Sequence, residues 1–134
     1  MEIFSVNQIG WIMARYEHLP VYKTGFDLLV WTEEVVRGFS RYHKYTIGTD
    51  LRNQIRKIVN SVVEANGISD KIETLRRLRL EIESMMLLVR VAKDVKAFPN
   101  VNSYGHAVGE LISLARQSEG WLKSQHRKQP ESPT

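Results

Sequence analysis

The chain has 134 residues, of which 43% are hydrophobic and 25% are charged, and it contains no cysteine. This length suffices for one domain with its own core, and the lack of cysteine excludes disulfides, zinc–cysteine sites and a cysteine nucleophile. The net charge of +4 favours an acidic partner such as nucleic acid. Because no apolar run reaches the ~18 residues of a membrane span and no secretory signal is recognisable, we expect a soluble, cytoplasmic protein with no membrane partner.

Helical spacing of apolar residues dominates the stretch between Pro20 and Pro99, which contains no proline. A turn at Gly48, with Thr46 or Thr49 as a cap, is expected to separate the first two helices. The predicted helices span residues 22–42, 49–66, 70–98 and 103–125. Four helices joined by short loops predict an all-α fold, an antiparallel up-down-up-down four-helix bundle over residues 20–124.

The two ends of the chain lie outside this predicted bundle. Residues 1–19 are an extension of uncertain structure. Either residues 1–15 form a short extra helix, or Met13 is the biological start and residues 1–12 are not native to the functional protein. Residues 125–134 are polar and include two prolines, so we expect a disordered tail.

The helix predicted over 70–98 has two apolar stripes, although a bundle helix needs only one. Asp70, followed by Glu73, resembles a capping box at its start, and Pro99 ends it after Phe98. The second stripe comprises Leu80, Leu87, Leu88, Val91, Val95 and Phe98. Either the N-terminal segment covers this stripe or it packs on another subunit. For the second alternative, the predicted subunit interface is Leu80, Leu87, Val91 and Phe98.

No pattern typical of catalysis or metal binding is present. Di-iron bundles need Glu-x-x-His on their helices, and no Glu here is followed by His three residues later; the four histidines are scattered. Phosphate-binding and nucleophile-elbow motifs are also missing from the sequence. We therefore expect no catalytic residue, no metal and no cofactor, and we predict that the protein is not an enzyme.

Positive charge is concentrated between residues 37 and 57, where six cations accompany one anion, Asp50. Antiparallel helices would bring these cations to one end of the bundle, where they could bind a phosphate backbone. The predicted nucleic-acid contacts are Arg37, Arg41, Lys44, Arg52, Arg56 and Lys57. The alternative is ordinary solvated surface, because no base-reading motif accompanies them. A second basic group, which includes Lys93 and Lys96, is diluted by acidic residues and is interpreted as ion-paired surface.

Several short motifs along residues 20–124 together resemble a known family. They begin with Tyr22-Lys23-x-x-Phe26-Asp27-Leu28-Leu29-x-Trp31 and His43-x-Tyr45-x-Ile47-Gly48. They continue with Leu51-Arg52, Glu64-Ala65-Asn66, Asp70-Lys71, Leu75, Leu78, Leu87-Leu88, Ala92 and Asp94, and end with Tyr104-x-x-Ala107 and Gly120-Trp121-Leu122-Lys123. Their order and spacing resemble the accessory variability determinant (Avd) proteins of diversity-generating retroelements. These belong to the four-helix-bundle superfamily that includes proteins encoded in intervening sequences of 23S rRNA genes.

The resemblance implies a bundle that assembles as a pentameric barrel. It also implies a basic, non-enzymatic partner of the retroelement reverse transcriptase and its template RNA in mutagenic retrohoming. Because phosphate contacts do not read sequence, DNA is a second expected ligand of the basic residues. Lys44-Tyr45 departs from the more usual Arg-Phe of that turn but keeps one cation and one aromatic ring. The rival interpretation is a structural or protein-interaction bundle with no nucleic-acid role, since the fold alone does not define function.

Overall fold

The computed structural model describes residues 19–128, and residues 1–18 and 129–134 lie outside the described part. The expectations for the N-terminal extension and for most of the tail fall outside it as well. The helices are α2 (Pro20–Arg37), α3 (Arg41–Tyr45), α4 (Ile47–Gly67), α5 (Ile72–Asp94) and α6 (Val101–Lys128). The bundle therefore extends beyond residue 124, and the expectation that residues 125–128 are disordered is wrong, because α6 continues through them.

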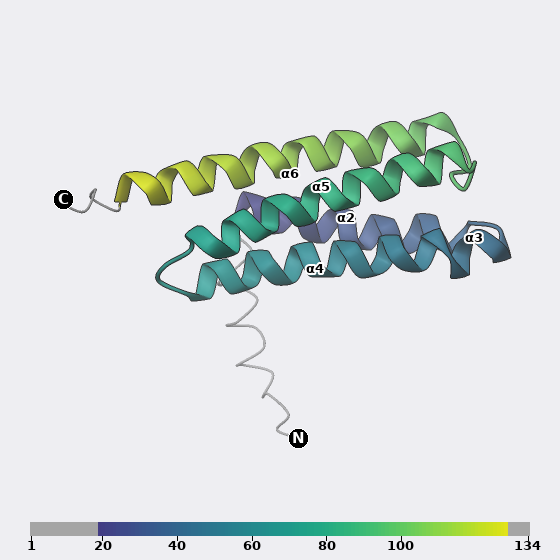
Figure 1. The fold of residues 1–134 in the computed structure, drawn as a ribbon. Coiled ribbons are helices and arrows are strands. Elements are labelled where there is room, and N and C mark those ends of the chain that lie inside the picture. The colour runs from purple at the N-terminus through teal and green to yellow at the C-terminus, as the bar shows by residue number, and fades with distance from the viewer. Residues whose placement is uncertain (1–18, 129–134) are drawn as a thin grey trace, which may run out of the picture.

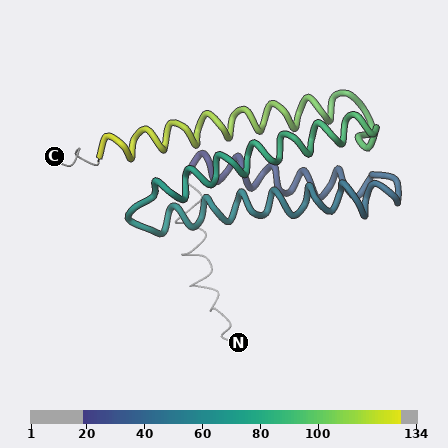
Figure 2. Tube along the Cα trace, viewed as in Figure 1, coloured from purple at the N-terminus to yellow at the C-terminus, as the bar shows by residue number. Residues whose placement is uncertain are grey.

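The four long helices run alternately in opposite directions (Figure 1). Neighbours in the chain pack together, α2 on α4, α4 on α5 and α5 on α6, and α2 also contacts α6 to close the bundle. The tube in Figure 2 shows that α3 and the turn between α5 and α6 lie at one end, which we call the α3 end, while the α4–α5 loop lies at the other. The predicted all-α, up-down four-helix bundle is confirmed.

The core consists of large aliphatic side chains that recur on one face of each long helix. Fully buried examples are Leu28 and Val36 of α2, Leu51, Ile55 and Ile58 of α4, Leu75, Leu78 and Met85 of α5, and Leu111 and Leu114 of α6. The buried Thr32 hydroxyl donates a hydrogen bond to the carbonyl oxygen of Leu28 at 2.7 Å. That bond satisfies the hydroxyl inside its own helix, so the core needs no polar partner for it.

The first helix ends at Arg37, five residues before the predicted end at 42. Gly38 follows as the C-cap, and its N–H donates to the carbonyl oxygen of Val35 at 3.1 Å. The chain then turns so that Phe39, which is 4% exposed, enters the core. The short helix α3 begins only after this turn, so burial of one phenyl ring divides the predicted helix in two.

Gly48 does not separate two helices as predicted; it is buried in the first turn of α4. A Cβ at this position would lie 2.7 Å from Val36 Cγ1 and 2.9 Å from the carbonyl oxygen of His43. The residue is glycine because α2 and α3 approach it closely. Thr46 is the N-cap residue of α4, one of the two predicted caps, but its hydroxyl makes no cap hydrogen bond and donates instead to the carbonyl oxygen of Tyr42 at 2.8 Å.

Helix α5 starts at Ile72. Asp70 binds the backbone at this start, but it does not form the predicted capping box with Glu73. Its Oδ1 accepts a hydrogen bond from the backbone N–H of Ile72 at 3.3 Å. The Glu73 carboxylate, which a capping box would direct back to the helix start, instead pairs with Arg76 at 2.9 Å. The cap is therefore a local turn around Asp70.

Helix α5 ends at Asp94, four residues before the predicted end at Phe98. The N–H of Ala97 donates to the carbonyl oxygen of Ala92 at 2.8 Å, and that of Lys96 donates to Lys93 at 3.0 Å. These two bonds form a Schellman motif, which satisfies carbonyl groups that the helix end leaves free. Lys96 has the left-handed φ of 63° that this motif requires.

Candidate nucleic-acid interface

Three of the predicted phosphate contacts lie together at the α3 end. Arg37 closes α2, and Arg41 and Lys44 belong to α3. Arg37 and Arg41 are exposed and Lys44 is half-buried. Within residues 19–128, none of the three takes part in an ion pair, so their charges are open to an external anion.

Arg52 and Arg56 share one carboxylate, that of Glu33 on α2. Arg52 Nε lies 3.0 Å from Glu33 Oε2, and an Arg56 guanidinium nitrogen lies 2.5 Å from Glu33 Oε1. The Arg52 side chain is 25% exposed and that of Arg56 is 53% exposed. The two arginines therefore join α4 to α2 across Glu33, and their charges are partly matched within the protein. Two cations and one anion leave this group with a single net positive charge.

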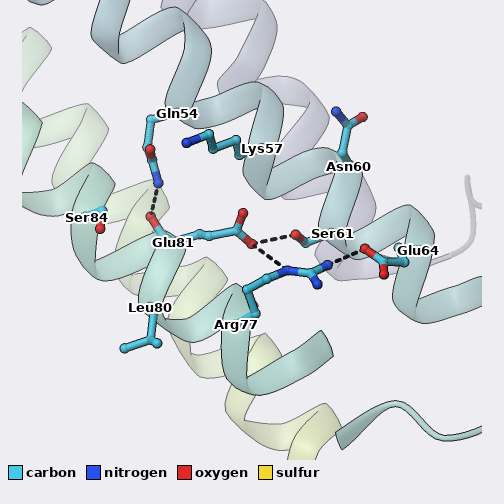
Figure 3. Close-up of a pocket in the computed structure, with 9 residues that line it drawn as sticks. All are labelled: Gln54, Lys57, Asn60, Ser61, Glu64, Arg77, Leu80, Glu81 and Ser84. Carbon is cyan, nitrogen blue, oxygen red and sulfur yellow. Dashed lines mark hydrogen bonds and ion pairs between the residues drawn. The ribbon is translucent and has the colours of Figure 1, made fainter. Parts of the chain in front are cut away.

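Lys57 lies on another side of α4 from Arg56, because one residue turns an α-helix by about 100°. It lines a shallow groove of about 540 Å³ between α4 and α5 (Figure 3). The remaining lining residues are Gln54, Asn60, Ser61, Glu64, Arg77, Leu80, Glu81 and Ser84. The six predicted contacts therefore differ in their surroundings. Three lie at the α3 end without an ion pair among the described residues, two bind Glu33 one turn before Arg37 on α2, and Lys57 lines this groove.

Charges in the α4–α5 groove are already matched within the protein. Glu81 Oε1 accepts a hydrogen bond from the Ser61 hydroxyl at 2.5 Å, and the Glu81 carbonyl oxygen accepts one from the Gln54 amide at 2.9 Å (Figure 3). Arg77 pairs with Glu64 and lies 3.9 Å from Glu81. Because Lys57 and Arg77 face two carboxylates, the groove has no excess positive charge for a phosphate. Its hydrogen bonds instead hold α5 against α4.

Lys93 and Lys96 lie near the α3 end, and sequence reasoning interpreted both as ion-paired surface. Neither takes part in an ion pair among the described residues; the neighbouring Asp94 pairs with Arg90 at 3.3 Å. Tyr42 and His43 of α3 line one hollow with Val91 and Val95 of α5, which places the last turn of α5 beside α3. The predicted topology already implies that Lys93 and Lys96 lie near residues 37–44, because the first and third helices of an up-down bundle end at the same end of the bundle.

An exposed apolar seam runs along α5 on the surface that the second stripe predicts. The side chains of Leu80 and Leu87 are 62% and 65% exposed, and those of Val91 and Val95 are 39% and 44% exposed. Leu80, Ser84, Leu87 and Val91 follow one another at intervals of four, three and four residues, the spacing of a coiled-coil seam. The alternative that the N-terminal segment covers this seam involves residues 1–18, outside the described part.

Phe98, the fourth residue of the predicted subunit interface, packs within its own chain. Its ring lies 5.7 Å from that of Phe39, 6.4 Å from that of Tyr104 and 6.5 Å from that of Trp31, measured between centroids. Phe98 is half-buried against these rings and is not part of the exposed seam, which ends at Val95. The chain reverses direction after Lys96 and so places Phe98 among these rings.

Among residues 19–128, no group of three or more His, Cys, Asp or Glu side chains is placed to hold a metal ion. In the same part of the chain, no helix is long and apolar enough to cross a membrane. A scan against protein-family models and a search of curated proteins give no match for this chain. The family that the motifs resemble is therefore an expectation from the sequence.

Proposed function

We propose that this protein is a non-enzymatic, oligomeric accessory protein that binds the reverse transcriptase and template RNA of a diversity-generating retroelement. The resemblance of its motifs to Avd proteins suggests the system. The observation that carries the nucleic-acid part is a group of three cations at the α3 end, Arg37, Arg41 and Lys44, which have no ion pair within residues 19–128. Such residues bind phosphates through counterion release, without reading sequence. The polymerase chemistry belongs to the reverse transcriptase.

The exposed seam on α5 supports assembly of several copies. Exposure of large apolar side chains such as Leu80 and Leu87 to water is unfavourable, because burial of apolar surface lowers the free energy. A second copy of the chain that packs against the seam would bury these side chains and gain this free energy. In a pentamer, the basic α3 end would occur five times, and weak phosphate contacts would then add up by avidity.

A structural or protein-interaction bundle without a nucleic-acid role is the second candidate. It is favoured by the internal pairing of many cations, because a paired arginine offers less charge to a ligand. Arg52 and Arg56 bind Glu33, and arginines along α5 pair with carboxylates on α4, α5 and α6. The two functions differ in salt dependence, since binding through phosphates weakens steeply as the salt concentration rises.

The test measures the affinity of the purified full chain for template-repeat RNA at several salt concentrations. Co-purification with a reverse transcriptase encoded nearby is measured in parallel. We expect a steep linear fall of log affinity with log salt, and a stable complex with the enzyme. Retention of the enzyme without any salt-dependent RNA binding would support the interaction bundle instead. Failure of both measurements would refute the proposed function.

A further inference from the structure

The turn between α5 and α6 lies at the α3 end (Figure 1). A small pocket is formed there. Its volume is about 190 Å³, and it is lined by Lys93, Lys96, Phe98, Asn100, Val101 and Tyr104. Sites for drug-sized ligands usually measure about 300–1,000 Å³. This pocket is therefore large enough for only one small group, and its walls combine two aromatic rings with two cations.

The Tyr104 ring is half-buried, and a cation already occupies one of its faces. Lys93 Nζ lies 4.8 Å from the centroid of the Tyr104 ring. Phe98 forms the edge of the pocket, with its ring centroid 6.4 Å from that of Tyr104. Lys93 is exposed, so its long side chain can turn towards a nearby phosphate. The face of Tyr104 is then free for a planar group.

Lys96 occupies a backbone conformation that glycine or asparagine normally supplies. Its φ of 63° is left-handed, and it is the only described non-glycine residue with a positive φ in residues 19–128. The Schellman motif at the end of α5 requires this conformation, and a side chain with a Cβ is strained in it. The lysine is exposed and takes part in no ion pair among these residues, so folding does not account for its positive charge.

We propose that this pocket binds one unpaired base of a single-stranded nucleic acid. The base stacks on Tyr104, while Lys93 and Lys96 contact the flanking phosphates. Aromatic platforms combined with cations are the usual means of binding single strands, because every base has a flat face. The inference rests on the proposed function and adds a preference for unpaired nucleic acid. Phe98 of the pocket contacts Phe39, which lies between Arg37 and Arg41 in the chain. The pocket and these two arginines therefore lie at the same end of the bundle.

The stacking step is tested with a labelled single-stranded RNA 12-mer and with a 12-mer of the same backbone in which every base is replaced by an abasic site. Wild-type protein should bind the base-bearing strand about tenfold more tightly, as expected for a stacked base. Tyr104→Leu keeps an apolar side chain beside Phe98 but has no flat face. This variant should bind the two strands equally and keep the wild-type salt slope, because the phosphate contacts persist.

The phosphate step is tested with Lys96→Gly, whose effects on stability and binding should have opposite signs. Glycine relieves the left-handed strain, so the melting temperature should rise by about 4 °C. Loss of one phosphate contact should reduce the log–log salt slope by about 0.7 on a single strand. Lys96→Arg should keep the wild-type slope, and Lys23→Gln, which removes a cation from the first turn of α2, should leave the slope unchanged.

The outcomes separate this inference from the proposed function. If the wild-type protein binds RNA but Tyr104→Leu still distinguishes the two strands and Lys96→Gly keeps the full slope, the pocket is not a base site and the proposed function stands. If both variants behave as expected while substitution of Arg37 and Arg41 has no effect, the pocket is the main site. A wild-type protein that binds no single strand refutes this inference, whereas the proposed function is decided by template-RNA binding and co-purification with the reverse transcriptase. Equal binding of single strands and duplexes would overturn the preference for unpaired nucleic acid.

Discussion

The rings of Phe39 and Phe98 meet edge to face, with centroids 5.7 Å apart and planes inclined at 87°. Phe39 lies between α2 and α3, and Phe98 lies between α5 and α6. Edge-to-face contact is a favourable geometry for aromatic pairs. This pair therefore joins the two turns, so that the cations of residues 37–44 and those of residues 93–96 lie at the same end of the bundle.

The exposed seam on α5 predicts the effect of charged substitutions on assembly. Leu87→Glu combined with Val91→Lys should convert an oligomer to monomers in analytical sedimentation, because both side chains would face a dry interface. The helical circular dichroism should persist, since neither side chain belongs to the buried core. Ile112→Glu on α6, where the side chain is also about two-fifths exposed, serves as the control and should stay oligomeric. A wild-type protein that is already monomeric at tens of micromolar would contradict the oligomer.

The free cations of the α3 end predict a loss of nucleic-acid affinity without a loss of stability. Arg37→Gln combined with Arg41→Gln should reduce the log–log salt slope by about 1.4 to 1.8, because two phosphate contacts disappear. The melting temperature should stay within about 1 °C, since neither arginine has an ion pair in the described structure. Lys23→Gln combined with Lys123→Gln changes the net charge equally at positions away from α3. An unchanged slope in the arginine variant would place the interface elsewhere.

Because Arg52 and Arg56 share the carboxylate of Glu33, their substitution should lower the stability of the fold, unlike substitution of Arg37 and Arg41. Arg52→Gln combined with Arg56→Gln should lower the free energy of unfolding by about 1 kcal/mol, because Glu33 loses both partners in a partly buried contact between α2 and α4. Chemical denaturation with the matched Arg37 and Arg41 variant as control measures the difference. If Glu33→Gln in the double-arginine background restores stability, the unpaired carboxylate is the cause. Equal stability of the two double variants would show that the ion pairs contribute nothing.

Two glycines predict opposite responses to alanine. Gly48→Ala should destabilise the protein by about 1–3 kcal/mol, because the new Cβ would collide with the buried Val36 and with the backbone of His43. Gly109→Ala, in the exposed middle of α6, meets nothing within 4 Å and should stabilise the protein by about 0.5–1 kcal/mol. Thermal unfolding of the two variants side by side measures both effects. Stabilisation by Gly48→Ala would mean that α2 and α4 can separate without cost.

Periodicity predicted the architecture but not the places where helices end. The apolar spacing identified four long helices, and their order implied an up-down bundle because the loops are short. The interruption at Gly38 to Ser40 and the reversal at Lys96 depend on whether Phe39 and Phe98 reach the core. A single sequence does not show that, because the ring partners lie far away in the chain.

The candidate site was only partly predictable for a similar reason. The sequence identifies where cations are concentrated, and three of them do lie together on the α3 end. It does not show which cations meet a carboxylate across a helix pair, so Glu33 was not recognised as the partner of Arg52 and Arg56. It also does not show that Lys57, one residue after Arg56, faces a different groove with its own matched charges.

The alternating direction of the helices has a consequence for the electric field at the α3 end. Helices α4 and α6 present their N-termini there, and α2 and α5 present their C-termini. The partial charges of these helix ends have opposite signs and largely cancel. Attraction of an acidic partner from a distance therefore depends on the side chains alone. Each cation removed from this end should slow the association of RNA at low ionic strength, while dissociation changes less.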